Sequence, residues 1–139
     1  MHKIFPRFVD GLPAWGLLVL RLVFGAGLVM HSLPKIQNPM HWMDLAKLSN
    51  AAPPVLQAAS ALFEFGGGIA IVLGLVTPLV AVIGLINFFT AYWTQSRGHQ
   101  WIGKGGFELI SLYFTVMLTL LLTGPGKVSI DAVLFGRKR

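Results

Sequence analysis

Long apolar runs, separated by short polar or proline-containing stretches, dominate this chain. Four of these runs are about as long as the ~20 residues that a helix needs to cross a bilayer. Each run ends at a proline, at a glycine or in a polar loop, where a helix is expected to stop. The pattern predicts an all-α membrane protein, a four-transmembrane-helix bundle that forms a single domain over residues 1–139. The expected spans are residues 13–33, 55–75, 78–95 and 106–123.

Shorter amphipathic segments lie between and beside the runs. Residues 1–12 and 40–48 mix apolar side chains with basic or acidic ones, a pattern typical of segments that lie at the membrane surface. The tail after residue 126 is expected to form one short helical turn, with Ser129 or Asp131 as its N-cap. We therefore expect interfacial segments around the bundle.

The composition agrees with a membrane protein. Apolar residues make up 55% of the chain and charged residues only 12%, whereas about 25% is usual in soluble domains. The absence of cysteine excludes a disulfide framework, a thiolate metal site and a dithiol redox couple in this chain. The net charge is +6, but the basic residues lie at the ends of the apolar runs. Membrane topology and anionic lipid explain that placement better than nucleic acid, which is not an expected partner.

The distribution of lysine and arginine predicts the orientation in the membrane. The side that holds both termini carries six of these residues near the spans, and the other side carries four. Positively charged loops stay in the cytoplasm, so both termini are expected to be cytoplasmic. The basic residues on the terminal side are Lys3, Arg7, Lys127, Arg137, Lys138 and Arg139, and those on the other side are Lys35, Lys47, Arg97 and Lys104.

A buried arginine is the most informative polar residue. Arg21 lies near the middle of the first span, where a charge is costly and needs a partner. With a rise of 1.5 Å per residue, Arg21, Glu64 and Asn87 lie about 12, 16 and 13 Å from the cytoplasmic side. Opposite charges at matched depth relieve each other's burial. We therefore predict an Arg21–Glu64 ion pair with Asn87 as a third member.

A second polar layer is expected near the outer face. His31 and Glu108 fall at similar depth there, and histidine titrates near neutral pH, so both are candidate proton-exchange residues. Lys35 follows His31 and lies 14 residues after Arg21, nearly four helical turns, so these two cations share one helix face. Arg21, Glu64, Asn87 and Lys35 are the candidate ligand-binding residues. The alternatives are a buried pair that only fixes helix register and a histidine that only bonds a nearby loop.

The sequence offers few cofactor sites. His31 is the only histidine within a predicted span, so a bis-histidine haem is not expected. No spacing such as H-E-x-x-H is present, so no metal site is expected either. Trp42, Trp93 and Trp101 fit interfacial anchors. The aromatic side chains Phe88, Phe89, Tyr92 and Trp93 could alternatively line a pocket for a flat ring.

Three stretches together resemble a known family. They are RLVFGAGLVMHSLPK (21–35), FEFGGGIAIVLGLVTPLVA (63–81) and the pair GGFELISLYF and LLLTGPGKVSID (105–114, 120–131). In this order and spacing the chain resembles the DoxX family of small four-helix membrane proteins. Ser32 stands where a glycine often follows the histidine, and Pro78 stands where the family often has an arginine.

The resemblance implies a multi-pass protein of the bacterial inner membrane that is linked to oxidoreductase complexes. The family takes its name from a small subunit of a quinol oxidase or thiosulfate:quinone oxidoreductase, and relatives associate with thiol-detoxifying or superoxide-handling partners. The leading hypothesis is therefore a membrane subunit of a redox assembly that binds quinone or supports a partner protein. A non-catalytic scaffold or assembly protein and a small-solute or proton pathway, which would need a homo-oligomer, are the alternatives.

Overall fold

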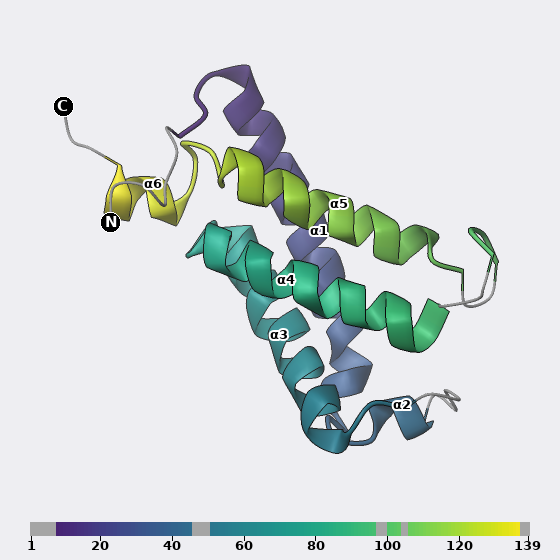
Figure 1. Ribbon diagram of the computed structural model, residues 1–139. Helices are drawn as coiled ribbons and strands as arrows, with labels where there is room; N and C mark the ends of the chain where they lie inside the picture. The colour runs from purple at the N-terminus through teal and green to yellow at the C-terminus, as the bar shows by residue number, and fades with distance from the viewer. Residues whose placement is uncertain (1–7, 46–50, 97–99, 104–105, 137–139) are drawn as a thin grey trace.

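The computed structural model describes residues 8–45, 51–96, 100–103 and 106–136, and all the regular secondary structure of this part is helical (Figure 1). No strand occurs among these residues. The all-α prediction is therefore confirmed. In chain order the helices are α1 (Leu12–Ile36), α2 (Trp42–Leu45), α3 (Pro54–Leu73), α4 (Thr77–Ala91) with the π-helical turn η1 (Tyr92–Ser96), α5 (Glu108–Thr123) and α6 (Ile130–Phe135).

Three of these helices are long and apolar enough to cross a membrane. They are Leu12–Ile36, Pro54–Leu73 and the continuous helix Thr77–Thr94. The fourth apolar helix, α5, has 16 residues and is shorter. The expected interfacial segment at 40–48 contains α2, and residues 46–50 lie outside the described part, as do residues 1–7 of the expected N-terminal segment.

Local sequence explains where the helices begin and end. α1 continues three residues past its expected end because Pro34 is accommodated within its last turns, as prolines often are in membrane helices. α3 ends at Gly74, which adopts the left-handed conformation (φ 64°) that glycine takes readily. α4 then starts at Thr77 with Pro78 in its first turn, where a proline sacrifices no helical hydrogen bond.

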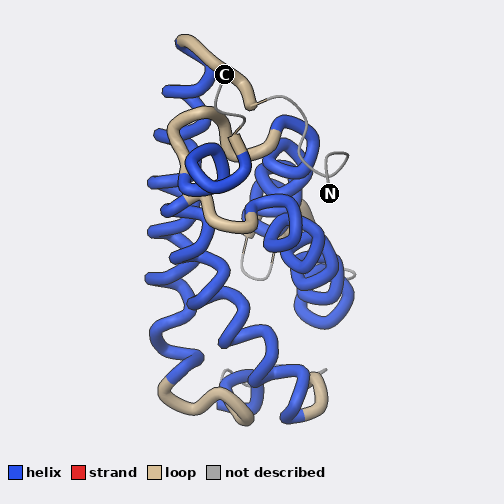
Figure 2. The backbone as a smooth tube through the Cα atoms, turned by 90° about the vertical axis from the view of Figure 1, so that its left-hand side faces the viewer, coloured by secondary structure: helices blue, strands red, loops and turns tan. Residues whose placement is uncertain are grey.

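We call α1, α3, α4 and α5 the four long helices. They form two antiparallel pairs, α1 with α3 and α4 with α5 (Figure 1). A Cβ atom on Gly25 would lie 2.6 Å from the Gly68 carbonyl oxygen, so the backbones of α1 and α3 nearly touch at these glycines. All four helices converge near α6 and diverge toward α2 (Figures 1 and 2). We call these the narrow end and the wide end of the bundle.

An apolar core joins the two pairs. The ring of Tyr113 on α5 lies 5.2 Å from both Phe24 on α1 and Phe88 on α4, edge to face in each case. Met117 packs against the backbone of α4 at Gly84, where a Cβ would meet its side chain within 3 Å. The buried core consists of Leu17, Phe24, Leu28, Ile71, Ala81, Phe88, Met117 and Leu120.

The segment after α5 closes the narrow end. Gly124 and Gly126 turn the chain with positive φ angles of 71° and 82°. Ser129 caps α6 by accepting a hydrogen bond from the Ala132 N–H, as the sequence predicted for one of two residues. Asp131, fully buried, accepts hydrogen bonds from the backbone N–H groups of Val76 (2.6 Å) and Thr77 (2.8 Å) at the start of α4. The motif GPGKVSID thus ties the tail to the α3–α4 turn.

Candidate functional site: a buried ion pair beside a membrane-facing cavity

The predicted Arg21–Glu64 pair is wrong. Arg21 is fully buried, and its guanidinium donates a hydrogen bond to the carbonyl oxygen of Val128 in the tail. It also interacts electrostatically with Asp131. Gly74 lies directly against it, since a Cβ there would come 2.0 Å from Nη1 of Arg21. Arg21 therefore belongs to the closure of the narrow end and is not part of a mid-membrane layer with Glu64.

Lys35 is the partner of Glu64. Its Nζ lies 2.6 Å from Oε2 of Glu64, and the two side chains are only 11% and 5% exposed. The expectation that Arg21 and Lys35 share one face of α1 is confirmed, because both are buried together with Gly25 and Ser32. The predicted helix face is therefore correct, but the cation on it that pairs with Glu64 is Lys35 and not Arg21.

The direction of helical side chains explains this exchange of partners. Side chains on an α-helix lean toward its N-terminus. α1 and α3 run in opposite directions, so Lys35 leans toward the narrow end while Glu64 leans toward the wide end, and the two approach each other. Arg21 leans away from Glu64. A depth estimate from backbone rise alone omits this displacement, which amounts to roughly one helical turn.

Other polar groups surround Glu64. Its Oε1 lies 3.4 Å from Oγ of Ser60 and 3.5 Å from Nδ2 of Asn87. The predicted neighbour Asn87 is thus confirmed. His31 on α1 and Tyr113 on α5 both interact electrostatically with Glu64. Side chains of α1, α3 and α4 therefore contact this carboxylate, and Tyr113 on α5 interacts with it electrostatically.

The structure does not bring Glu108 and His31 together. Glu108 lies exposed in the first turn of α5, and its backbone N–H donates to the Trp101 carbonyl. His31 lies on the surface of α1 beside the Lys35–Glu64 pair. Among the described residues no three His, Asp or Glu side chains gather as a metal site requires. Of the two candidate proton-exchange residues, only His31 adjoins the buried charges.

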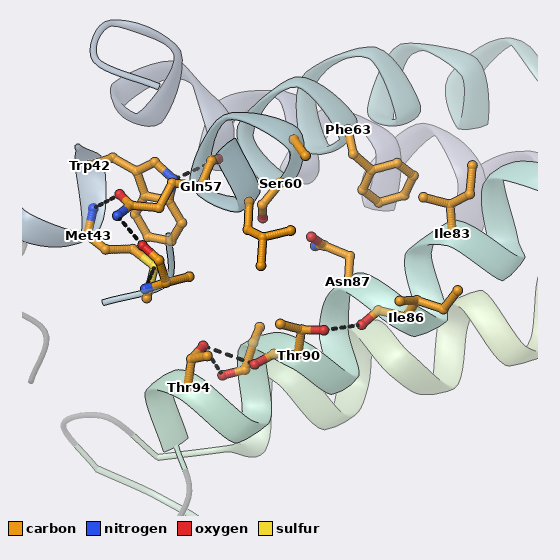
Figure 3. Close-up of a pocket in the computed structure, with 14 residues that line it drawn as sticks. Trp42, Met43, Gln57, Ser60, Phe63, Ile83, Ile86, Asn87, Thr90 and Thr94 are labelled. Atoms are coloured by element: carbon orange, nitrogen blue, oxygen red, sulfur yellow. Dashed lines mark hydrogen bonds between the residues drawn. The ribbon is translucent and has the colours of Figure 1, made fainter. Parts of the chain in front are cut away.

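A cavity of about 220 Å³ lies between α2, α3 and α4 (Figure 3). Its wall is mostly apolar, but Ser60 and Asn87, the two neighbours of Glu64 Oε1, also line it. Leu56 and Ile86 on its rim are 54% and 63% exposed, so the cavity opens on a surface that faces lipid in a membrane. The complete lining is Trp42, Met43, Ala52, Leu56, Gln57, Ala59, Ser60, Phe63, Ile83, Ile86, Asn87, Thr90, Ala91 and Thr94.

The short helix α2 covers the wide end of this cavity. Gln57, almost fully buried, holds it with two hydrogen bonds: its backbone oxygen accepts from Trp42 Nε1 (3.0 Å), and its Oε1 accepts from the Met43 N–H (2.9 Å). Its Nε2 donates a third hydrogen bond to the oxygen of Ala52 (2.7 Å), just before α3. The Trp42 ring lies 4.5 Å from Nζ of Lys35, a cation–π contact. Trp42 is only 9% exposed, so the interpretation of this tryptophan as an interfacial anchor is wrong.

A second cavity, of about 270 Å³, lies between α4 and α5. Phe88, Phe89 and Tyr92 line it, together with Phe114, so three of the four aromatic residues that were candidates for a ring pocket do line one cavity. Ser111, Thr115 and the hydroxyl-bearing Tyr92 are the polar residues of its lining. Of these two cavities, the first is the one lined by residues in contact with Glu64.

Sequence reasoning missed three residues of the site. Gln57 and Tyr113 were not singled out, and Trp42 was interpreted as an interfacial anchor. The two prolines before Gln57 gave no signal that its side chain would bind α2. Tyr113 follows Glu108 by five residues, which places it on another face of α5 than this candidate residue.

A protein-family model described as DoxX matches residues 16–97, more than half of the chain. The match covers α1 from residue 16 onward, α2, α3 and α4, and with them the Lys35–Glu64 pair and all the lining residues of the first cavity. No curated protein and no solved structure matches the chain. The chain belongs to the DoxX family and is a multi-pass membrane protein.

Proposed function

We propose that this protein is a subunit of a redox-linked assembly in the bacterial inner membrane and that it binds a quinone in the cavity between α2, α3 and α4. In this proposal α5 crosses the membrane as the fourth span, and both termini are cytoplasmic. The carrying observation is that a buried Lys35–Glu64 pair lies directly behind Ser60 and Asn87, two polar residues in the lining of a lipid-facing cavity. Ionisable groups inside a membrane are costly and usually mark a binding or proton-transfer site.

The cavity suits the head group of a quinone in size. An apolar cavity of roughly 150 Å³ holds a benzene ring, so about 220 Å³ accommodates a ring with small substituents. The exposed rim residues Leu56 and Ile86 leave a path for an apolar tail into the lipid. A mostly apolar wall with a few polar groups is also what small-molecule sites usually present.

The residues divide into distinct roles. Ser60 and Asn87 contact the ring oxygen, and Glu64, held by Lys35, lies immediately behind them. His31, beside the pair and on the surface of α1, exchanges protons between Glu64 and the surroundings. Arg21 holds the tail, and Glu108 lies apart from the cavity, so neither contacts the ring.

Titration of the purified protein in nanodiscs with a short-tailed ubiquinone or menaquinone tests this proposal. We expect saturable binding that Ile86→Phe weakens at least tenfold, because the larger side chain fills the cavity rim. Ile69→Phe is the matched control, since Ile69 on α3 is 43% exposed and does not line the cavity. Absence of saturable binding, or equal weakening by both variants, would overturn the proposal.

A non-catalytic scaffold is the second candidate. The observation in its favour is that the buried charges also connect helices and tail, so they could serve the bundle alone. The scaffold hypothesis is favoured over quinone binding if the wild-type protein binds no quinone and yet forms a stoichiometric complex with a partner oxidoreductase. In that complex Asn87→Leu would leave the partner's quinone-dependent turnover unchanged, whereas a quinone site would lose most of it.

A further inference from the structure

We propose that α6 is a membrane-surface anchor. Its exposed apolar face inserts among the lipid head groups, and the basic residues beside it in the chain select anionic phospholipid. The inference is independent of the proposed quinone site and concerns the narrow end of the bundle, opposite α2. It names the partner of this surface as an anionic bilayer and not another protein.

One face of α6 is apolar and is not covered by the rest of the described structure. Ile130, Val133 and Leu134 occur at i, i+3 and i+4, the spacing that places side chains on one helix face. All three are exposed, Val133 and Leu134 to 80% and 61%. Asp131, the polar residue of this helix, is fully buried. α6 therefore presents apolar side chains outward and its carboxylate inward, the reverse of a helix that faces water.

Hydrogen bonds to the bundle hold α6 in this orientation. The Asp131 carboxylate accepts from the N–H groups of Val76 and Thr77. The Asp131 backbone N–H donates to the Gly74 oxygen over 2.9 Å. The helix cannot turn its apolar face inward without breaking these bonds. The exposed apolar face is therefore a fixed feature of the surface.

This face continues a surface that contacts lipid. α6 lies beside the narrow end of the four long helices (Figure 1). Exposed apolar side chains also occur there, at the starts of α1 and α4 and near the end of α5, namely Leu12, Leu79 and Leu122. In a membrane protein such side chains face lipid. An amphipathic segment at this position buries its apolar face at the boundary between head groups and acyl chains.

The charges next to α6 favour anionic lipid. Lys127 precedes the helix and is exposed, and residues 137–139, which follow it in the sequence, are Arg-Lys-Arg. The acidic residues at this end are Asp131, which is buried, and Asp10, which pairs with Lys127. Each lysine or arginine near a negatively charged bilayer strengthens binding to it. An apolar face and a basic cluster together supply the two contributions that stable surface binding requires.

Spin labels on single cysteines measure the depth of α6, because the chain has no cysteine of its own. Val133→Cys and Leu134→Cys are labelled in the full chain in phosphatidylglycerol nanodiscs. Power saturation compares the accessibility of each label to oxygen, which concentrates in lipid, and to a water-soluble nickel chelate. We expect an oxygen-to-nickel ratio at least threefold higher than at Asp10→Cys, an exposed polar position at the same end. Equal ratios would overturn the anchor and leave this face to a protein partner.

The same labels test the choice of lipid. In phosphatidylcholine nanodiscs, or after Arg137→Gln/Lys138→Gln/Arg139→Gln in phosphatidylglycerol, the ratio at Leu134→Cys should fall at least twofold. Arg97→Gln/Lys104→Gln is the matched control and should leave the ratio unchanged, since these basic residues precede α5 in the sequence. An unchanged ratio in phosphatidylcholine, or an equal fall in the control, would overturn the selection of anionic lipid.

The wild-type protein gives a readout that needs no label. Hydrogen exchange in peptides of residues 128–135 should be at least threefold slower in phosphatidylglycerol than in phosphatidylcholine nanodiscs. Peptides that cover α2, at the wide end, are the control and should exchange equally in both. Equal rates for residues 128–135 would overturn the selection of anionic lipid even if the cysteine variants did not fold.

Discussion

Gly25 and Gly68 face each other where α1 and α3 come closest. A Cβ on Gly25 would lie 2.6 Å from the Gly68 oxygen, and a Cβ on Gly68 would lie 2.9 Å from the Gly25 oxygen. Small residues allow such approach between membrane helices. The contact sets the register in which Lys35 meets Glu64, because both residues lie on the same two helices.

Gly25→Ala should therefore destabilise the protein by about 1–3 kcal/mol, the usual cost of inserting an atom into a packed interface. The matched control is Gly66→Ala, because nothing lies within 4 Å of its added Cβ and alanine favours the helix. Thermal unfolding in detergent measures both. A Gly25→Ala midpoint at or above that of Gly66→Ala would contradict the close packing.

Lys35→Met should cost more stability than Lys35→Met/Glu64→Met. The single change leaves a buried carboxylate without its cation, at about 3–5 kcal/mol, whereas the double change removes both charges. The measurement is again the unfolding midpoint in detergent, with Arg21→Met/Glu64→Met as a comparison that leaves Lys35 unpaired. If Lys35→Met/Glu64→Met is less stable than Lys35→Met, the two side chains do not form the buried ion pair that the structure shows.

Asp131→Ala should loosen the narrow end. It removes two hydrogen bonds to backbone N–H groups and the carboxylate near the buried Arg21, a loss of about 3 kcal/mol or more. Hydrogen exchange at Val76 and Thr77 should accelerate together with the drop in midpoint. Asp44→Ala is the control, since Asp44 is 53% exposed and its partner His41 is exposed as well. Unchanged exchange at both amides would show that Asp131 does not cap α4.

Asp10 should titrate below its ordinary pKa of 3.8. The side-chain hydrogen bond from Lys127 is the main cause that lowers the pKa of this carboxyl group. A lowered folded-state pKa contributes stability above pH 3.8, and this contribution disappears as the pH falls through the lower value. Carbon-13 NMR of the Asp10 carboxyl group should show Lys127→Gln raising its pKa. An unchanged value would mean that the two side chains do not pair in the membrane-embedded protein.

The helices were predictable because the apolar runs that form them, and the glycine and proline residues that end them, act on the backbone locally. Expected and observed ends agree within about three residues, and Pro78 and Gly124 mark boundaries in both. The expected second span ran through Gly74, where α3 in fact ends. The polar face of α1 was predictable for the same reason, since helical periodicity alone places Arg21 and Lys35 together. Among the described residues, secondary structure and the faces of single helices therefore followed from the sequence.

Partners across helices were not predictable to the same degree. Backbone rise locates a Cα atom, but long side chains such as Arg21 and Lys35 carry their charges several ångströms farther along the helix. Asp131 illustrates a second limit, because its bonds to Val76 and Thr77 join residues 55 and 54 positions apart. Nothing local to either segment specifies that contact.

The hydrogen bond from Arg21 to Val128 has a consequence for how the protein is made. The two residues are 107 positions apart in the chain, so α1 emerges from the ribosome long before the carbonyl group that receives its guanidinium exists. Until Val128 has been added to the chain, the Arg21 guanidinium lacks this hydrogen-bond acceptor. The four long helices can therefore settle into their final arrangement only after α5 and the turn beyond it have been translated.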